Sequence, residues 1–318
     1  MMDGMTLVIK EKEPLAPHTV YKIGGQARFF AEARDGEQAR EALYFAARNR
    51  LPFFILGAGS NTLVSDDGFD GIAIHMTGGR VRHDGERMIV SAGVMMARTA
   101  AEAARAGLAG FAWAAGVPGT IGGSVRGNAG CFGREMKDAV ESVEIFDTAG
   151  DDVRRVSSAD CAFAYRDSIF KRRPEWVVLE ATLALKAGNT AVIQDEMRRM
   201  SAERASKQDI GTQSCGCIFK NPAWPRTPVS REKLLTDFPE LAAYANRPEI
   251  PAAFLIDRAG MKGKREGRIA VSPKHANFFI NEGGGTAAQV RSLIATAQGA
   301  VREKYGIELR EEIQYLGF

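Results

Sequence analysis

The order of hydrophobic and polar positions predicts helices and strands from residue 36 onward. Small apolar side chains recur at helical spacing over residues 36–49, which predicts an amphipathic helix. The alanine-rich segment 98–105 has high helix propensity and predicts a second helix. Short apolar runs at 53–56, 72–76 and 88–91 are typical of buried strands. We therefore expect the first third of the chain to mix strands and helices.

The middle of the chain shows the two-residue period of strands. Apolar runs at 143–146 and 153–156 flank the turn segment 147–150 (DTAG), a pattern that predicts a β-hairpin. Hydrophobic and polar residues alternate over 176–185, which predicts a strand with one buried face. Residues 191–207 have the character of a highly charged helix, and we expect this helix to join two domains.

The last third of the chain has a different character. Residues 208–285 are rich in Pro, Gly and Asn and contain few periodic runs. A strong helix follows, with Thr286 as its N-cap and Gly306 as its stop. We find no internal repeat and no regular strand–helix–strand alternation, so an α+β fold is favoured over a doubly wound sheet. The apolar stripe of the last helix consists of Val290, Leu293, Ile294, Ala297 and Val301.

Composition and charge argue against several classes of protein. The 318 residues include 42 basic and 39 acidic side chains, a formal net charge of +3, without a basic run that contains aromatics, so we expect no nucleic-acid partner. No stretch reaches the roughly 18 apolar residues of a membrane span. Residues 1–17 contain no apolar signal core. We therefore expect a cytoplasmic protein that does not bind membranes, and we expect a monomer.

The cysteines and histidines show no pattern of a disulfide framework or a metal site. Cys215 and Cys217 form a CxC pair, which offers two ligands where a zinc site needs about four. The histidines do not have metal-ligand spacing, so we expect no bound metal. The four histidines are His18, His75, His83 and His275.

A glycine-rich segment at 57–61 (GAGSN) is the first feature that points to chemistry. It follows the apolar run 53–56, and glycine lets a backbone approach a phosphate closely. The third glycine of the GxGxxG fingerprint is missing and residues 62–68 have no helical pattern, which excludes a Rossmann unit. Taken alone, this segment is explained equally well as a structural turn.

A second segment, 116–130, contains so many glycines that we expect no regular element in it. Each ordered glycine costs roughly 0.5–1 kcal/mol relative to alanine, and a loop lying along an extended ligand would justify that cost. An irregular buried loop is the alternative. The two segments together favour a dinucleotide-binding site.

These segments belong to a longer series of motifs. The series consists of HT at 18–19, IGG at 23–25, GAGSN at 57–61, AGVPGTIGGS at 115–124, GNAG at 127–130, YRDSIFK at 165–171, GCIFKNP at 216–222, LID at 255–257 through Gly263, KHANF at 274–278 and the end of the chain at 309–317. In this order, and over nearly its whole length, the chain resembles the UDP-N-acetylenolpyruvoylglucosamine reductase (MurB) family.

The resemblance implies an α+β fold of the vanillyl-alcohol-oxidase (PCMH) type, in which FAD lies between two subdomains and a further domain binds the substrate. We place the FAD-binding subdomains at 1–78 and 79–207 and the substrate-binding domain at 208–318, with a last strand that returns to the first subdomain. One branch of the family has an inserted loop between its arginine and serine motifs. Residues 172–216 leave no room for it, so the chain resembles the loopless second type.

The resemblance also implies FAD as cofactor and NADPH as co-substrate. The expected FAD-binding residues are Gly57, Ala58, Gly59, Ser60, Asn61, Gly116, Pro118, Gly119, Gly122, Gly123, Ser124 and Asn128. The expected substrate is UDP-N-acetylglucosamine enolpyruvate, which is reduced to UDP-N-acetylmuramate for peptidoglycan. Lys220, Asn221 and Lys262 match family positions near that substrate, and lysine is suited to a diphosphate.

The implied reaction gives the substrate's vinyl carbon a hydride and spreads negative charge into its carboxylate, where the charge must be stabilised. The family's arginine and glutamate fall on Arg166 and Glu312, although the usual LEPE motif is LREE at 309–312. A guanidinium can hold a carboxylate with two hydrogen bonds. Without the resemblance, an ion pair of Arg166 with Asp167 and a solvated Glu312 would be the simpler interpretations.

The proton donor departs from the family pattern, because Cys217 stands where the family usually has serine. A thiol has a reference pKa near 8.5, far below that of an alcohol, and can act as general acid if it stays protonated. The alternatives are a small buried hydrophobic residue or a redox pair with Cys215, which a reducing cytosol disfavours.

Two other functions remain as alternatives. An FAD-dependent oxidase of the same fold, acting on an alcohol or a sugar, would share the glycine segments but would not need Cys217 or the segment 219–222 (FKNP). A non-catalytic nucleotide-sugar binding protein would keep Lys220 and Asn221 but would not need Arg166 or Glu312.

Overall fold

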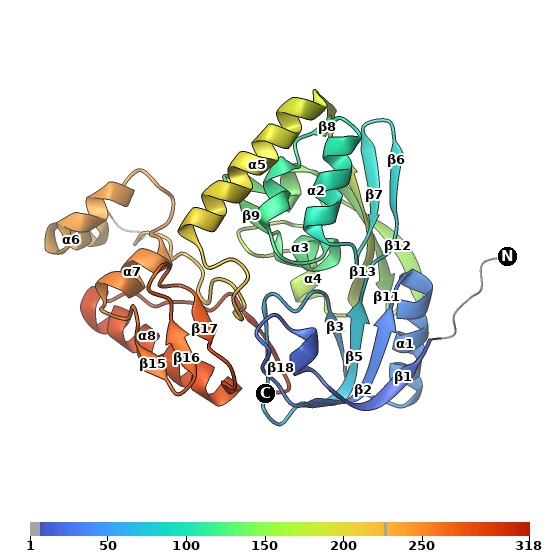
Figure 1. Cartoon of the computed structure of the whole chain (residues 1–318), viewed down its shortest axis with the longest axis horizontal. Helices are drawn as coiled ribbons and strands as arrows, with labels where there is room; N and C mark the ends of the chain where they lie inside the picture. Colours follow the sequence, from blue (N-terminus) through green and yellow to red (C-terminus); the bar gives the residue numbers. More distant parts are fainter. Residues whose placement is uncertain (1–6, 226–227) are drawn as a thin grey trace.

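The structure is a computed structural model that describes residues 7–225 and 228–318. Figure 1 shows two adjoining parts, with the sheets of the first two thirds of the chain on the right and a smaller C-terminal part on the left. Helix α5, Thr190–Lys207, leads from the larger part toward the smaller one. The C-terminus lies back beside the larger part.

The first sheet has four strands in the order β1-β2-β5-β3. β1 is antiparallel to β2, whereas β2, β5 and β3 run parallel. Helix α1, Gly36–Arg48, packs on β2 and β5 with Ala39 and Ala46 buried, and Asp35 caps it by accepting from the Gln38 N–H. The elements are β1 Ile9–Pro14, the 3-10 helix η1 Ala16–His18, β2 Gln26–Ala33, β3 Phe53–Leu56 and β5 Phe69–Met76.

The second sheet has five antiparallel strands in the order β12-β11-β13-β7-β6. β11 and β12 form the predicted hairpin, and the Asp147 carboxylate closes its turn by accepting from the N–H groups of Ala149 and Gly150. Helices α2 and α5 pack against each other and against η2. The strands are β6 Val81–Asp84, β7 Arg87–Ser91, β11 Val140–Asp147, β12 Asp152–Ser157 and β13 Trp176–Ala184; the helices are α2 Met96–Arg105, η2 Ala112–Gly116, η3 Met136–Asp138 and α4 Ile169–Arg172.

Residues 116–130 contain a short helix, α3 Ile121–Gly127, so the prediction of a wholly irregular segment is wrong. Thr120 caps the helix, and Asn128 ends it with a left-handed backbone at φ 43°. A Cβ on Gly122 would lie 2.8 Å from the Cβ of Ala92. Close packing therefore explains a glycine inside the helix, where glycine is normally unfavourable.

The C-terminal part is built around the long helix α8, Ala287–Tyr305. As predicted, Thr286 caps the helix, in a capping box with Gln289, and Gly306 ends it at φ 66°. Two strands of the antiparallel sheet β15-β16-β17 contact it. The other elements are α6 Pro228–Asp237, η4 Pro239–Tyr244, α7 Ala252–Arg258, β15 Arg265–Glu266, β16 Ile269–Val271 and β17 Phe279–Asn281.

Short strands complete the structure, and one pair brings the last strand of the chain beside residues 62–64. The last strand, β18 Gln314–Leu316, pairs parallel with β4 Thr62–Val64, which directly follows the GAGSN segment. The C-terminus is thereby fixed beside the first glycine segment. The other short pairs are β8 Leu108–Ala109 with β14 Lys186–Ala187 and β9 Gly130–Cys131 with β10 Arg134–Glu135.

Most predicted elements are confirmed with small shifts of their ends. Strand β3 has the predicted bounds, and helix α1 ends one residue before residue 49. Strands β5 and β7 begin before the apolar runs at 72–76 and 88–91. Backbone pairing causes this difference, because hydrogen bonding between strands continues past the residues whose side chains are buried.

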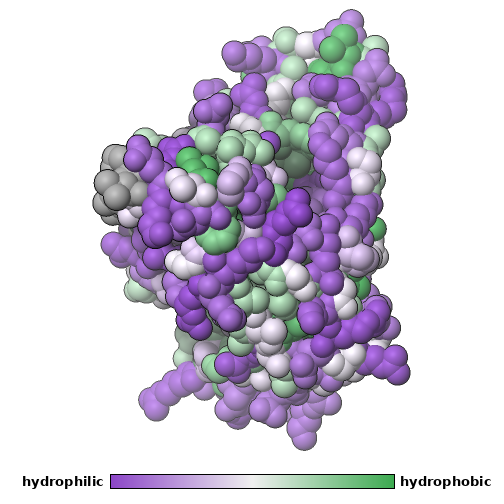
Figure 2. All heavy atoms as spheres, turned by 90° about the vertical axis from the view of Figure 1, so that its left-hand side faces the viewer, coloured by the Kyte–Doolittle hydropathy of each residue, from purple (hydrophilic) through white to green (hydrophobic). Residues whose placement is uncertain are grey.

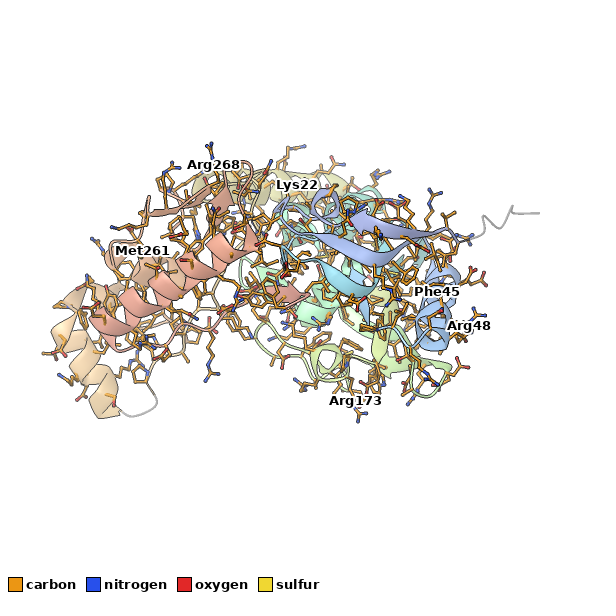
Figure 3. All side chains as sticks on the ribbon, turned by 90° about the horizontal axis from the view of Figure 1, so that it is seen from below. Lys22, Phe45, Arg48, Arg173, Met261 and Arg268 are labelled. Atoms are coloured by element: carbon orange, nitrogen blue, oxygen red, sulfur yellow. The ribbon has the colours of Figure 1, made fainter. Side chains whose placement is uncertain are left out.

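Two large hydrophobic cores match the two parts of the molecule, one between the two sheets and their helices and one around α8. Figure 3 shows Phe45 and Arg48 of α1 at one end of the molecule and Met261 and Arg268 at the other. The face that includes the C-terminal part is largely hydrophilic, with hydrophobic atoms in small areas (Figure 2). Within the described residues, no helix has both the length and the hydrophobicity needed to cross a membrane.

Candidate active site

The fold brings the two glycine-rich segments into direct contact. A Cβ on Gly57 would lie 2.6 Å from the Oγ1 of Thr120, and a Cβ on Gly119 would lie 3.2 Å from the Oγ of Ser60. Gly119 also has φ 124°, a backbone conformation that residues with a Cβ rarely adopt. The glycines are therefore required where one segment approaches the other.

The first segment presents free backbone donors. Within the part of the chain that the structure describes, the N–H groups of residues 58–61 donate no hydrogen bond. Gly59, at φ 62°, packs so closely on residues 18–19 that a Cβ would lie 2.6 Å from the His18 carbonyl oxygen. A run of unpaired N–H groups in a glycine loop is suited to an anion such as the diphosphate of a dinucleotide.

Asn128, expected to bind FAD, has its side-chain amide engaged within the protein. Its Nδ2 donates to the Glu135 carboxylate at 3.1 Å and to the Ala164 carbonyl at 2.9 Å, and its Oδ1 accepts from the Lys137 N–H. The residue is fully buried. The side chain therefore supports the turn that begins at Ala164.

That turn places Arg166. The N–H and C=O groups of Ala164 and Asp167 bond each other at 3.0 and 3.1 Å, and Arg166 between them is left-handed at φ 53°. Its carbonyl accepts from Lys171 Nζ at 2.7 Å, and its Nη2 donates to the Gly130 carbonyl at 3.2 Å. The turn thus directs the guanidinium away from Asp167, which pairs with Arg172 instead.

Arg166 and Glu312 form an ion pair, with 2.9 Å between Nε and Oε1, and both side chains are largely buried. Burial raises the pKa of Glu312, and the nearby charges of Arg166, Lys171 and Lys220 oppose this shift. Burial disfavours the charged form of Arg166 and is the largest single effect on its pKa, but Glu312, Tyr165, Cys217 and Glu135 together outweigh it, so the pKa is raised. The structure thus overturns the interpretations of Arg166 as a partner of Asp167 and of Glu312 as a solvated charge.

Cys217 lies beside this pair. Residues 218–220 run next to 310–312, where the Glu312 N–H donates to the Ile218 carbonyl and the Lys220 N–H donates to the Arg310 carbonyl. Burial raises the pKa of Cys217 to about 12, with Glu312 adding to the shift and Arg166 opposing it. Cys217 is therefore a thiol at neutral pH.

Asn277 holds the Cys217 segment in place. Its Oδ1 accepts from the Phe219 N–H at 2.9 Å, and its Nδ2 donates to the Phe219 carbonyl at 2.8 Å. Asn277 is nearly fully buried and lies close enough to the Cys217 thiol to lower its pKa. Asn277 thus joins the KHANF segment at 274–278 to the GCIFKNP segment at 216–222.

The first glycine segment is connected to Glu312 through Asn61. The Asn61 Nδ2 donates to the Glu312 carbonyl at 3.2 Å, and the Asn61 carbonyl accepts from the Gln314 N–H at 2.8 Å. A shift of residues 57–61 would therefore move the backbone of Glu312.

The three expected substrate-binding residues lie in different surroundings. Lys220 is close enough to affect the charge of Glu312. Asn221 caps helix α7, with its Oδ1 accepting from the Ala252 N–H at 2.9 Å, while its own N–H donates to Tyr165 Oη. Lys262 pairs with Asp257 at 2.9 Å. The structure thus brings Lys220 to Glu312, gives Asn221 a structural bond, and pairs Lys262 within the C-terminal part.

Two charged residues of the site were not singled out from the sequence. Lys171 is part of the YRDSIFK segment, and burial, together with Lys220 and Arg126, lowers its pKa to about 8. Arg204 of α5 affects the pKa of both Cys131 and Cys217, and its Cδ would lie 3.2 Å from a Cβ on Gly116. Nothing in the sequence distinguishes Arg204 from the other arginines of α5.

Comparison with known proteins agrees with this geometry. A family model described as the C-terminal domain of UDP-N-acetylenolpyruvoylglucosamine reductase matches residues 208–316, and one described as an FAD binding domain matches residues 27–157. The chain is 36% identical over 315 residues to the UDP-N-acetylenolpyruvoylglucosamine reductase of Solibacter usitatus, which covers 98% of this chain and 97% of that protein. It is 35% identical over 323 residues to that of Caldanaerobacter subterraneus, over 100% and 98%.

The fold is shared with a solved structure as well. The crystal structure of UDP-N-acetylenolpyruvylglucosamine reductase (MurB) from Thermus caldophilus matches at a TM-score of 0.74 and 29% identity, over 98% of both chains. The predicted α+β, FAD-binding fold is therefore confirmed. Since the identity extends over the full length of the chain, this protein belongs to the UDP-N-acetylenolpyruvoylglucosamine reductase family of FAD-dependent oxidoreductases.

Proposed function

We propose that this protein reduces UDP-N-acetylglucosamine enolpyruvate to UDP-N-acetylmuramate, a peptidoglycan precursor, in the cytoplasm, with NADPH as the source of electrons. The observation that carries the proposal is the buried Arg166–Glu312 pair, at 2.9 Å, beside the protonated thiol of Cys217. These are the groups needed to hold a carboxylate and to protonate a neighbouring carbon.

FAD fits the glycine segments. The free N–H groups of residues 58–61 suit its diphosphate, and Gly57 and Gly119 allow a backbone approach that a Cβ would block. Bound FAD would supply the hydride, after NADPH has reduced it. The remaining steps fall to side chains of this chain.

Arg166 has the capacity to hold the substrate carboxylate. A guanidinium has five N–H donors. Two of them have partners among the described residues, namely Nε with Glu312 and Nη2 with the Gly130 carbonyl. Three donors remain for a carboxylate, whose charge grows as hydride adds to the vinyl carbon. Glu312 fixes the guanidinium in the orientation that this contact requires.

Cys217 is suited to donate the proton. A pKa of about 12 keeps the thiol protonated in the resting enzyme. After proton transfer, the positive charges of Arg166 and Arg204 stabilise the thiolate, since both lower the pKa of Cys217. Solvent then returns the proton. Burial alone would make this thiol an inert hydrophobic residue. The two nearby arginines are what favour its role as general acid.

Lys220, beside Glu312, is positioned to bind the anionic nucleotide sugar near the reacting end. We assign Lys262 to a more distant anionic group, for which it would have to exchange its partner Asp257. We infer a monomer, with NADPH and the enolpyruvyl substrate using one site in turn.

The test separates the two half-reactions. Purified enzyme is reduced under anaerobic conditions with one equivalent of NADPH, and the flavin absorbance near its visible maximum is followed. The expected result is full bleaching, then recovery of the absorbance when UDP-N-acetylglucosamine enolpyruvate is added, with UDP-N-acetylmuramate formed in equal amount. Reduced enzyme given UDP-N-acetylglucosamine, which lacks the enolpyruvyl group, is the matched control and should stay bleached.

Two results would contradict the proposal. Reduced enzyme that stays bleached with the enolpyruvyl substrate would exclude the reductase reaction. Flavin bleaching by an alcohol or a sugar without NADPH, followed by reoxidation with oxygen, would show an oxidase instead.

A further inference from the structure

Two histidines and a glutamate meet on the outer face of the first sheet, away from the residues assigned to catalysis. Glu32 of β2 and His75 of β5 are direct neighbours in the parallel register. His18 of η1 lies over them, with its ring centroid 4.3 Å from that of Phe30 and 5.3 Å from that of His75. Each of the three residues offers one ligand atom, and these atoms lie within 4.8 Å of one another. We propose that His18, Glu32 and His75 bind a divalent transition-metal ion of the zinc class.

The state of His18 supports this site. Its Nε2 lies 3.0 Å from the Glu13 carboxylate. An ionised carboxylate only accepts hydrogen bonds, so Nε2 is the donor in this contact and Nδ1 is the ring nitrogen available to a metal. A carboxylate that binds one ring nitrogen while the other faces a metal is the usual support of a metal-binding histidine. Glu13 is placed for that supporting role.

His75 has an unused ring nitrogen. Its Nδ1 is buried and has no hydrogen-bond partner among the described residues. This buried nitrogen is therefore available to a ligand.

The ligand set selects the class of metal. Two imidazoles and one carboxylate suit zinc, cobalt and nickel, whereas magnesium and calcium prefer oxygen ligands alone. Zinc–nitrogen distances of about 2.0–2.1 Å place tetrahedral ligand atoms about 3.4 Å apart. The three side chains must therefore move closer together than 4.8 Å, and the exposed Glu32 is free to do so. The nearby Lys10 pairs with Glu13 at 3.5 Å, which offsets its repulsion of a cation.

A metal bound at this site would restrict the movement of the first glycine segment. The Val20 N–H donates to the Gly59 carbonyl at 3.2 Å, and a Cβ on Gly59 would contact the His18 carbonyl. Leu56, directly before the segment, is paired with His75. A metal that fixes His18 to His75 therefore holds residues 57–61 from two sides.

The experiment uses the full-length protein without an affinity tag, stripped of metal with a chelator. It is titrated with Co²⁺, whose visible absorption bands report bound imidazole, and Zn²⁺ is then added as competitor. We expect one Co²⁺ per chain, displacement by Zn²⁺, and a rise in melting temperature with Zn²⁺. His75→Gln and Glu32→Gln should each weaken Co²⁺ binding at least about tenfold, since each removes one of three ligands.

Two matched variants serve as controls. His83→Gln removes an exposed histidine of β6, and Glu37→Gln removes an exposed glutamate of α1; both should leave the titration unchanged. Glu32→Gln changes an exposed side chain and preserves its shape, so it keeps the test valid if His75→Gln does not fold. Absence of Co²⁺ bands in the unaltered protein, or bands of equal strength in Glu32→Gln and Glu37→Gln, would overturn the proposal. The binding measurement does not depend on turnover, so its outcome is separate from that of the proposed reaction.

Discussion

The larger part of the molecule and its C-terminal part contribute to the site in different ways. The larger part offers backbone groups held on two regular sheets, namely the free N–H groups of residues 58–61 and the glycines that face them. The C-terminal third offers side chains from short irregular segments, Cys217, Lys220 and Glu312. Arg166 is the exception, because it belongs to the larger part and pairs with Glu312 across the boundary.

This difference indicates that the two parts have different roles, one suited to the cofactor and one to the substrate. A cofactor that stays bound is best held by a rigid backbone, whose donors need no side-chain ordering. Substrate chemistry needs ionisable side chains whose pKa values depend on burial. On the proposed function, the contacts between the parts, Arg166 with Glu312 and Asn61 with the Glu312 carbonyl, would set the geometry of cofactor and substrate together.

The largest expected effect comes from removing Cys217, the proposed proton donor of the C-terminal part. Cys217→Ala should leave reduction of the flavin by NADPH intact and slow the second half-reaction by about 10²–10⁴, the usual contribution of a general acid. Rapid-mixing absorbance of each half-reaction measures this separately. Cys217→Ser, with a hydroxyl in the same place, should retain activity. A Cys217→Ala enzyme with both half-reactions at normal rates would remove Cys217 from the mechanism.

Breaking the contact between the two parts should have the next largest effect. Arg166→Met keeps the length of the side chain but removes the charge, and should slow reoxidation by the enolpyruvyl substrate by about 10²–10³. It also leaves the largely buried Glu312 without its partner, so the melting temperature should fall. Arg173→Met changes an exposed arginine that pairs with Glu175 and lies over the Trp176 ring, and it should leave both properties nearly unchanged. Equal rates for the two variants would contradict the role of Arg166.

A change in the rigid backbone should act on the cofactor and not on the chemistry. Gly57→Ala places a Cβ 2.6 Å from the Oγ1 of Thr120 and should weaken FAD binding by about tenfold, or about 1.4 kcal/mol. Gly127→Ala, in the same region, meets open space and should bind FAD as the unaltered protein does. Titration of the FAD-free proteins, followed by flavin fluorescence, gives both affinities. Loss of FAD from both variants alike would show that crowding at Gly57 is not the cause.

The smallest effect concerns stability. Burial lowers the pKa of Lys171 from 10.5 to about 8. Below pH 8 the buried charge therefore destabilises the folded protein, and this destabilisation is lost as the pH rises toward 10.5. The melting temperatures of the unaltered protein and of Lys171→Met are compared from pH 7 to pH 10. Over this range the value for the unaltered protein should therefore rise relative to that of the variant. We expect about 2–4 °C, which corresponds to about 1 kcal/mol, because solvent screening of the partly exposed Lys171 reduces the effect of the full shift. A constant difference between the two melting curves across this range would speak against a buried, titrating Lys171.

Hydrophobic periodicity was sufficient to predict the regular helices and strands but not the structure of the glycine-rich segments. Strand β3 and helix α8 agree with their patterns because the burial of one face produces a regular spacing of apolar residues. Helix α3 was missed because its glycines lower helix propensity, while close packing against Ala92 requires them. The sequence also did not indicate the contacts of Asn128. A motif suggested that it contacts the cofactor, and in the structure its side chain hydrogen-bonds Glu135 and the turn at Ala164.

The sequence by itself determined the regular elements, the family, and which residues are candidates for chemistry, since these depend on local patterns and on motifs in order. Only the tertiary structure decided which candidates meet. It paired Arg166 with Glu312 and not with Asp167, set Lys171 beside them, and brought His18, Glu32 and His75 together although their spacing predicts no metal site. The physical reason is that strand register and domain packing are set by the burial of the whole chain, so contacts between distant residues cannot be read from any single segment.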